Sequence, residues 1–216
     1  PGYHGFAFGA EALEVNLACV AMFRITSDLS YLSDKSDIPT YAIAWTTTPW
    51  TLPSNTALCV GPNIDYMLLE TVMPRTEEPC RIVMAKALVG SMFPEGKSPA
   101  YTVVGECKGR DLEGLRYEQL IPWVKPREGS EQGSFRIILG DYVTTEDGTG
   151  IVHIAPTFGA DDAAVAKAAG IPSLYMINKK LETRPMVDFS GKYYTIDDLD
   201  DDFVAQFVNE ELYKEY

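Results

Sequence analysis

The sequence predicts a β-rich α/β fold whose core is a β-barrel-like assembly of short strands with a few peripheral helices. Short apolar segments recur along the chain, each bounded by Gly, Pro, Asn or Asp, which is typical of small strands joined by turns. Helical periodicity is confined to three segments, and no internal repeat is present. These features favour a barrel or a sandwich, organised as a single domain over residues 1–216.

The first strand is predicted from strict alternation. Apolar residues occupy every second position from Val15 to Ile25, the period of a strand with one buried face. Segments rich in β-branched and aromatic residues predict further strands, at 41–46, 56–60, 66–72, 81–85, 101–105, 135–140, 151–154 and 173–178. Residues 1–14 lack any such period and are interpreted as a lead-in loop or the edge of a fragment.

Three helices are predicted, at 85–92, 160–169 and 199–209. Gly170 directly follows the second, as expected at a helix C-terminus. Asp161 and Asp162 lie in its first turn, where the helix dipole favours negative charge, so on local evidence both aspartates are simply caps. The third helix belongs to an acidic tail, residues 190–216.

The chain is acidic, with 18 basic residues against 31 acidic ones and a net charge of −13. That sign is wrong for a free-standing nucleic-acid binder, which must neutralise several phosphates. If RNA is the substrate, we expect this chain to meet only its terminal nucleotide. No apolar run approaches the ~20 residues of a membrane span, and we expect a monomer without a membrane partner.

The cysteines indicate a reducing compartment. The four of them are scattered, at positions 19, 59, 80 and 107, without a Cys-x-x-Cys pair, and the only histidines are His4 and His153. A structural zinc site is therefore not expected. We interpret the cysteines as small buried hydrophobic residues of a cytoplasmic protein and assign no disulfide.

An unusual segment, Trp-Thr-Thr-Thr-Pro-Trp-Thr-Leu-Pro-Ser-Asn, runs from Trp45 to Asn55. Each proline lacks a backbone donor and disfavours helical geometry at the preceding residue. Thr48 and Leu52 are therefore predicted to lie outside helices, in a loop after the 41–46 strand. Threonine hydroxyls beside the Trp50 indole suit a pocket for a small, partly polar group. The alternative is a turn whose hydroxyls bond their own backbone.

A second segment, Asp-Gly-Thr-Gly-Ile-Val-His-Ile-Ala-Pro-Thr-Phe-Gly-Ala-Asp-Asp, runs from Asp147 to Asp162. Its Asp-Gly start signals a hairpin, the short strand carries His153, and proline and glycine then end the strand. A lone histidine in a strand is more commonly a core residue with its hydrogen bonds satisfied than a functional group. Taken alone, this segment is a hairpin, a strand and a helix start.

Together the two segments closely resemble the editing domain inserted into isoleucyl-tRNA synthetases, and the resemblance is strong from about residue 15 to residue 188. It implies hydrolysis of the ester that joins a wrong amino acid, chiefly valine, to the terminal ribose of the isoleucine tRNA. The implied partners are that tRNA 3′ end with its valine and the remainder of the parent synthetase. No cofactor is implied.

The resemblance also implies a catalytic set. Thr46, Thr47 and Thr48 would line the pocket and position water or the carbonyl oxygen, because an activated ester needs orientation and fixed donors more than a nucleophile. Asp162 would receive the ammonium group of the amino acid through a charge-assisted contact.

Three further residues would bind the substrate according to the resemblance. Trp50 and Asn55 would shape the approaches of the adenosine and the aminoacyl group. His153 would wall off the side-chain pocket and exclude isoleucine by bulk while admitting valine. The chain departs from the family pattern at Ile154, Asp161 and Ala163, which puts pocket size and water order in question rather than the reaction class.

Two other interpretations stay open. A non-catalytic insert could dock the tRNA 3′ end or space two domains. A metal hydrolase could use His153, Asp161 and Asp162, although the sequence offers few further ligands. The chain has no His-Ile-Gly-His or Lys-Met-Ser-Lys-Ser motif, so the ATP-dependent synthetic site of the parent enzyme is expected to lie outside it.

Overall fold

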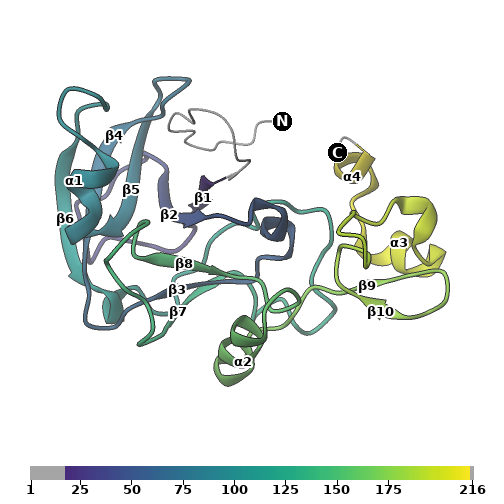
Figure 1. The fold of residues 1–216 in the computed structure, drawn as a ribbon. Helices are drawn as coiled ribbons and strands as arrows, with labels where there is room; N and C mark the ends of the chain where they lie inside the picture. Colours follow the sequence, from purple (N-terminus) through teal and green to yellow (C-terminus); the bar gives the residue numbers. More distant parts are fainter. Residues whose placement is uncertain (1–17, 215–216) are drawn as a thin grey trace. The chain divides into compact units, whose positions relative to one another are not determined.

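A computed structural model describes residues 18–214, and its largest sheet has five strands in the order β1-β2-β5-β4-β6 (Figure 1). The strands are β1 (Cys19–Arg24), β2 (Thr40–Thr46), β4 (Asp65–Val72), β5 (Pro79–Ala85) and β6 (Thr102–Lys108). Strands β2 and β5 pair in parallel, and the other neighbours pair antiparallel. Strands β2 and β5, which are distant in sequence, are therefore neighbours in this sheet.

A second sheet has three strands in the order β7-β3-β8. It comprises β3 (Ala57–Val60), β7 (Arg136–Leu139) and β8 (Ile151–Ile154). All four residues of the central strand β3 are buried, as expected for a strand covered on both faces. The β-rich α/β class is thus confirmed, with the described strands forming open sheets rather than a closed barrel.

Helices are short and lie mostly in the second half of the chain. They are α1 (Val89–Met92), α2 (Ala160–Ala169), α3 (Asp201–Phe207) and α4 (Glu210–Lys214). Single 3₁₀ turns or short 3₁₀ helices occur at Pro49–Ser54 (η1), Lys86–Leu88 (η2), Gly109–Leu112 (η3) and Ile196–Asp198 (η4). A two-stranded ribbon joins β9 (Met176–Ile177) to β10 (Thr183–Arg184).

Most predicted elements are present, with several differences. The predicted helix at 85–92 is split into η2 and α1, and the predicted strand at 173–178 is reduced to the two residues of β9. Strand β10 was not predicted. The start of the first predicted strand, at residue 15, and the lead-in segment 1–14 lie outside the described residues.

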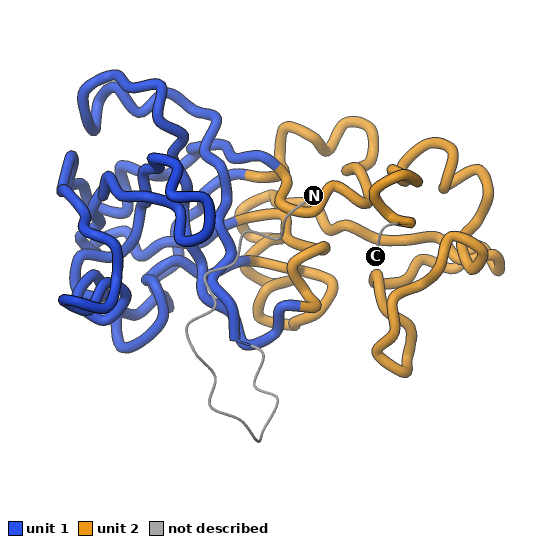
Figure 2. The backbone as a smooth tube through the Cα atoms, turned by 90° about the horizontal axis from the view of Figure 1, so that it is seen from above, with its two compact units in different colours: residues 1–49, 58–118, 136–153 blue, residues 50–57, 119–135, 154–216 orange. Residues whose placement is uncertain are grey.

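The chain divides into two compact units, each assembled from separate stretches (Figure 2). Unit 1 contains the described residues up to Pro49 together with 58–118 and 136–153. Unit 2 contains 50–57, 119–135 and the described residues from Ile154 onward.

The core of unit 1 lies on the five-stranded sheet. Its largest fully buried side chains include Phe23, Ile43, Leu68 and Ile82, and burying such a side chain contributes about 1.5–3 kcal/mol each. Tyr66 is also fully buried. Its hydroxyl donates to the Gly150 carbonyl (2.6 Å) and accepts from the Gly61 N–H (3.0 Å), so the polar end of the ring is satisfied inside the core.

The cysteines behave as hydrophobic residues. All four are free thiols, with Cys59 and Cys80 buried and Cys19 and Cys107 partly buried. Burial raises the pKa of both Cys80 and Cys107 to about 11. These thiols are therefore protonated and poorly nucleophilic at neutral pH.

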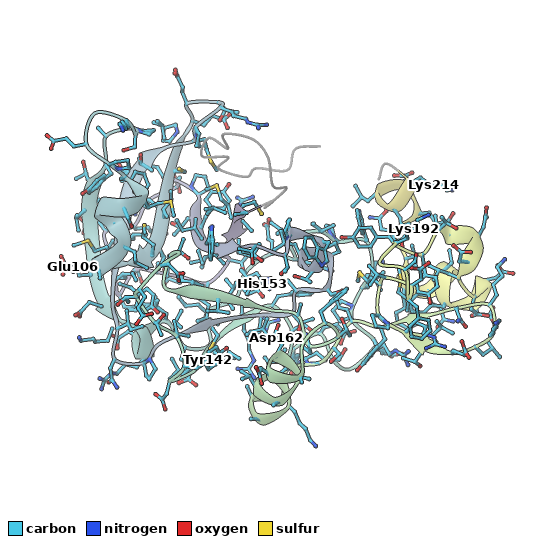
Figure 3. All side chains as sticks on the ribbon, viewed as in Figure 1. Glu106, Tyr142, His153, Asp162, Lys192 and Lys214 are labelled. Atoms are coloured by element: carbon cyan, nitrogen blue, oxygen red, sulfur yellow. The ribbon has the colours of Figure 1, made fainter. Side chains whose placement is uncertain are left out.

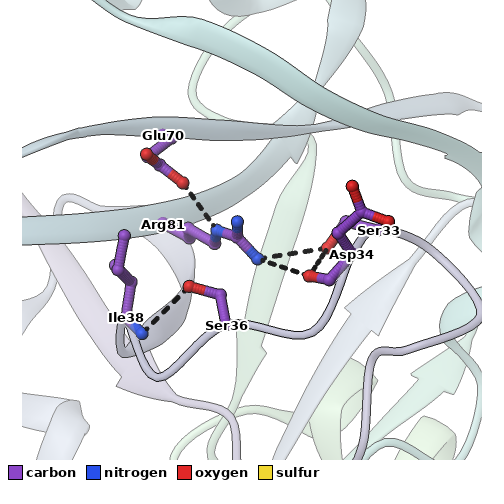
Figure 4. Close-up of polar contacts among 6 residues, drawn as sticks. All are labelled: Ser33, Asp34, Ser36, Ile38, Glu70 and Arg81. Atoms are coloured by element: carbon purple, nitrogen blue, oxygen red, sulfur yellow. Dashed lines mark hydrogen bonds and ion pairs between the residues drawn. The ribbon is translucent and has the colours of Figure 1, made fainter.

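One buried arginine fixes the long loop after β1 (Figure 4). Arg81, 9% exposed, donates from Nε to the Glu70 carboxylate at 2.9 Å. Its Nη1 donates to Ser33 Oγ and to the Asp34 carbonyl, both at 3.2 Å. Because β5 and β4 are paired at Arg81 and Glu70, the ion pair is preorganised, and the loop is held by an already oriented guanidinium.

The core of unit 2 is aromatic. The Trp123 ring meets Tyr193 and Tyr213 edge to face, with centroids 5.4 and 5.3 Å apart. Helix α3 begins at Asp200, whose carboxylate accepts the Phe203 N–H at 2.9 Å, an N-cap. No helix within residues 18–214 is both long enough and apolar enough to cross a membrane.

Candidate functional site

The threonine bend begins where β2 ends. The buried Thr46 hydroxyl accepts the Thr48 N–H at 3.0 Å, and the two hydroxyl oxygens are 3.3 Å apart. The side chain of Thr47, between them, is exposed. Thr46 thus forms a hydroxyl turn with its own backbone, as the structural alternative predicted, and it also brings two hydroxyls of the predicted set into contact.

The loop prediction for the next residues is wrong, because Pro49–Ser54 forms the 3₁₀ helix η1 and includes Leu52. Pro53 cannot donate to the Trp50 carbonyl three residues earlier, as a 3₁₀ helix requires. The Tyr193 hydroxyl donates to that carbonyl instead, at 2.6 Å, while the Asn55 N–H closes the last turn on Leu52 (3.1 Å). A distant side chain therefore satisfies the acceptor that proline leaves open.

Asn55 is 2% exposed, and its amide nitrogen donates to the Ala57 carbonyl at 2.8 Å. The next residue, Thr56, donates its N–H to Ile154 O (3.0 Å) and accepts the Phe135 N–H (2.7 Å). The end of the threonine-rich segment is thus hydrogen-bonded to the residue that follows His153. Trp50, by contrast, is 49% exposed.

The second segment also meets the first within unit 1. A Cβ atom on Gly148 would lie 3.4 Å from the Trp45 ring, so the indole packs on the glycine turn. Gly150 has a φ of +72°, and a Cβ there would lie 2.3 Å from the Ala85 Cβ. Glycine is required at this position for both reasons. In each unit, therefore, part of one motif adjoins part of the other.

His153 is 9% exposed, on strand β8. Burial lowers its pKa to about 4, because a cationic imidazole loses its hydration there. At neutral pH the ring is uncharged. His153 is therefore suited to form a neutral wall and unsuited to hold an anion.

Asp162 is a half-buried residue of unit 2, on helix α2 (Figure 3). Both aspartates lie in the first turn of α2, as predicted, but neither is its N-cap, because Gly159 takes that position. Asp162 Oδ2 instead accepts the Ala155 N–H at 2.8 Å. Burial is the main cause that raises the Asp162 pKa, with the nearby Asp161 carboxylate adding to it. No cation within residues 18–214 forms an ion pair with Asp162.

The units divide the predicted site residues. Thr46, Thr47, Thr48 and His153 belong to unit 1, and Trp50, Asn55 and Asp162 belong to unit 2. Sequence reasoning missed three hydroxyls of unit 2 that are buried without a hydrogen-bond partner among the described residues, those of Ser54, Thr56 and Thr157. Ser54 and Thr157 lie inside the two motifs and Thr56 directly follows the first, which was the available signal. Tyr193 gave no such signal.

No three His, Cys, Asp or Glu side chains in the described part of the chain are grouped so that they could hold a metal ion. The proposed ligands His153, Asp161 and Asp162 therefore do not form a metal cluster within residues 18–214. Asp161 is exposed and Asp162 is half-buried.

Comparisons with known proteins find close relatives. An isoleucine–tRNA ligase of Bacteroides fragilis is 60% identical over 189 residues, covering 82% of this chain and 16% of that protein. The isoleucine–tRNA ligase of Porphyromonas gingivalis is 49% identical over 212 residues, covering 92% of this chain and 18% of that protein. The chain thus spans about one sixth of the length of these relatives. No protein-family model matches it.

A solved structure shows the same fold. The crystal structure of GlLeuRS-CP1 matches with a TM-score of 0.51 and 18% sequence identity, over 68% of this chain and 57% of that chain. At this low sequence identity, the similarity between the two structures concerns the backbone fold alone.

Proposed function

This chain belongs, as one segment, to the isoleucine–tRNA ligase family, and we propose that it is the editing domain, hydrolysing the ester of valyl-tRNA(Ile) to free valine and tRNA. The function rests on chemistry that ester hydrolysis requires: an anchor for the ammonium group, fixed donors near the carbonyl, and a pocket that selects by size.

The environment of Asp162 is the main observation that supports this proposal. Its half-buried carboxylate lacks a cation partner among the described residues, and burial raises its pKa. An ammonium group bound there would restore the charge balance and favour the ionised carboxylate. The Ala155 N–H fixes one oxygen, which leaves the other available to the substrate. Every amino acid ester carries this ammonium, so the contact recognises the class rather than the side chain.

The threonines supply oriented hydroxyls. The hydroxyl oxygens of Thr46 and Thr48 lie 3.3 Å apart, so one hydroxyl donates to the other. A hydroxyl held by its neighbour is preoriented toward water or the developing oxyanion, which is the requirement for electrostatic stabilisation. Thr47 supplies a further exposed hydroxyl. Trp50 and Asn55 then shape the approach of the adenosine and the aminoacyl group.

His153 sets the size limit in this proposal. A neutral, immobile ring excludes isoleucine by bulk, admits valine, and does not repel the substrate's ammonium group. Discrimination by one methylene in a tight pocket is typically worth about 1–3 kcal/mol. The partners are the tRNA 3′ end with its valine and the rest of the synthetase. We propose a cytoplasmic monomer that needs no cofactor.

The decisive experiment replaces Asp162. The chain is mixed with tRNA(Ile) carrying labelled valine, and release of valine is followed. Asp162→Asn keeps an acceptor for the Ala155 N–H but removes the charge, and we expect kcat/KM to fall about 10–150-fold, the equivalent of a charged hydrogen bond of about 1.5–3 kcal/mol. Asp161→Asn, at the exposed neighbour, is the matched control and should retain activity.

A second variant tests the chemistry against docking alone. Thr48→Val removes the hydroxyl while keeping the shape, and Thr48→Ser restores it. If the chain only docks the tRNA end, neither this variant nor Asp162→Asn changes turnover, and wild-type chain releases no valine beyond the uncatalysed rate. Loss in Thr48→Val with recovery in Thr48→Ser supports catalysis by oriented hydroxyls.

A further inference from the structure

An exposed aromatic ring projects from the turn 188–192 in unit 2. Phe189 is 94% exposed, and the Arg184 guanidinium carbon lies 5.0 Å from its ring centroid. We infer that these two side chains form a stacking platform for one unpaired nucleobase of the tRNA 3′ end. This inference rests on the proposed function, because that function brings a single-stranded RNA end to unit 2.

The turn that carries Phe189 is held by hydrogen bonds that do not involve the Phe189 ring. Asp188 accepts the Ser190 N–H (2.8 Å), the Ser190 hydroxyl (2.7 Å) and the Lys192 N–H (3.0 Å), all at Oδ1. The Asp188 N–H donates to the Lys192 carbonyl at 2.7 Å. Gly191 supplies the positive φ of +82° that the turn needs. The fold therefore holds Phe189 outward, where the ring buries almost no area of its own.

Arg184 is oriented by a hydrogen bond to a neighbouring acidic residue. Its guanidinium donates to the Glu182 carboxylate at 2.8 Å, and Asn178 Nδ2 donates to the same carboxylate at 2.9 Å. The arginine is thus oriented by a fixed acid and presented to the Phe189 face, a cation–π arrangement. Aromatic and guanidinium planes are the surfaces on which proteins stack unpaired bases.

A small pocket adjoins the platform within unit 2. It has a volume of about 190 Å³. Its lining consists of Thr157, Phe158, Arg184, Pro185, Val187, Asp188, Phe189 and Tyr194. The Thr157 hydroxyl oxygen is buried and has no hydrogen-bond partner among the described residues, so it is available to a polar ligand edge. Thr157 also lies on the loop between Ala155 and the start of helix α2, and Asp162, the proposed ammonium anchor, lies in the first turn of that helix.

The chemistry of this surface favours a base over the alternatives. A nucleobase offers a π face to Phe189 and a polar edge to the Thr157 hydroxyl. An apolar side chain of a protein partner would leave the Thr157 hydroxyl unsatisfied, at a desolvation cost. A phosphate would need unpaired cations, whereas Arg184 is already paired with Glu182. Stacking with few phosphate contacts also suits an acidic chain.

The test is a double-mutant cycle on binding. The full chain is titrated with short single-stranded RNAs of the tRNA 3′ end that carry valine through a non-hydrolysable amide, and each terminal nucleotide is made abasic in turn. Phe189→Ala should weaken binding of the intact RNA about 5–150-fold, the range for loss of one stacked base. With the abasic RNA that lacks the stacked base, the same substitution should cost nothing further.

Three matched variants make the cycle specific. Phe189→Tyr should keep the affinity, whereas Phe189→Leu, which keeps apolar bulk without a π face, should lose it. Tyr175→Ala removes another exposed aromatic ring of unit 2, 39% exposed, and should change nothing. If Phe189→Ala binds every RNA as tightly as wild type does, the platform is refuted. It is also refuted if the substitution lowers the affinity for all abasic RNAs equally, a pattern that would indicate a contact with the RNA backbone or within the protein.

Kinetic measurements of ester hydrolysis distinguish a failure of this inference from a failure of the proposed function. With valyl-tRNA(Ile), Phe189→Ala should raise KM and leave kcat unchanged, because the stack binds ground state and transition state equally. If wild-type chain hydrolyses the ester but the cycle shows no coupling, the platform fails and the proposed function stands. If coupling is found but no ester is hydrolysed, the proposed function fails and the base-binding surface stands.

Discussion

Acidification should destabilise this fold through one imidazole, that of His153. The pKa of its ring is lowered from 6.5 to about 4 by burial, whereas the unfolded chain titrates at the ordinary value. The unfolded state therefore binds a proton that the folded state does not hold, and falling pH favours unfolding. The loss begins near pH 6.5 and is complete below about pH 4.

The size of the effect follows from these two values. Between pH 7 and pH 5, proton linkage at one such site lowers the free energy of unfolding by about 2 kcal/mol, and by about 3 kcal/mol at pH 4. His153→Gln removes the ionisable ring and with it this slope, while all other titrating groups are unchanged. The wild-type-minus-variant difference in unfolding free energy isolates the His153 contribution.

Two measurements check this prediction. Urea unfolding of both proteins at pH 7 and pH 5, followed by circular dichroism, gives the difference. Imidazole NMR signals give the pKa directly, and the chain has only two histidines to assign. A His153 resonance that titrates near pH 6.5, or equal pH slopes in the two proteins, would show that the ring is solvated and would remove the neutral-wall argument.

Two further substitutions test the packing of unit 1. Gly150→Ala should lower the free energy of unfolding by about 1–3 kcal/mol more than Gly114→Ala: both glycines have a positive φ, but only at Gly150 does the added Cβ meet an atom, Ala85 Cβ at 2.3 Å. Arg81→Met should cost about 1.5–3 kcal/mol, because it removes the charged hydrogen bond to Glu70, whose side chain is 37% exposed. Thermal unfolding measures both, and equal costs for the two glycine variants, or a neutral Arg81→Met, would contradict these contacts.

Regular local signals predicted the elements well. The bounds of α2 follow from alanine-rich composition and from Gly170, which has a φ of +67°. Strands β2, β4 and β8 follow from apolar runs with turn residues at both ends. The parallel pairing of β2 with β5 could not be read, because it depends on contacts between segments far apart in sequence rather than on either segment alone.

The failures occur where distant groups override local preference. The 49–54 segment forms a 3₁₀ helix despite two prolines because Tyr193, 143 residues after Trp50, supplies the missing donor. Asp162 is not the N-cap because Gly159 takes that position, and the Asp162 carboxylate accepts the Ala155 N–H instead. At the site, the chemical types were predictable, whereas the hydroxyl pairing and the neutral state of His153 required burial and geometry.

The discontinuity of the two units imposes an order on the folding of the nascent polypeptide. Strand β8 completes the three-stranded sheet as soon as Ile154 has been made, and residues 155–216, most of unit 2, follow over roughly 3–12 s at typical elongation rates. Over that interval Thr56 already has both of its backbone partners, Phe135 and Ile154, whereas the Trp50 carbonyl still lacks the Tyr193 hydroxyl. The 3₁₀ helix η1 can therefore gain its last hydrogen bond only after Tyr193 has been synthesised.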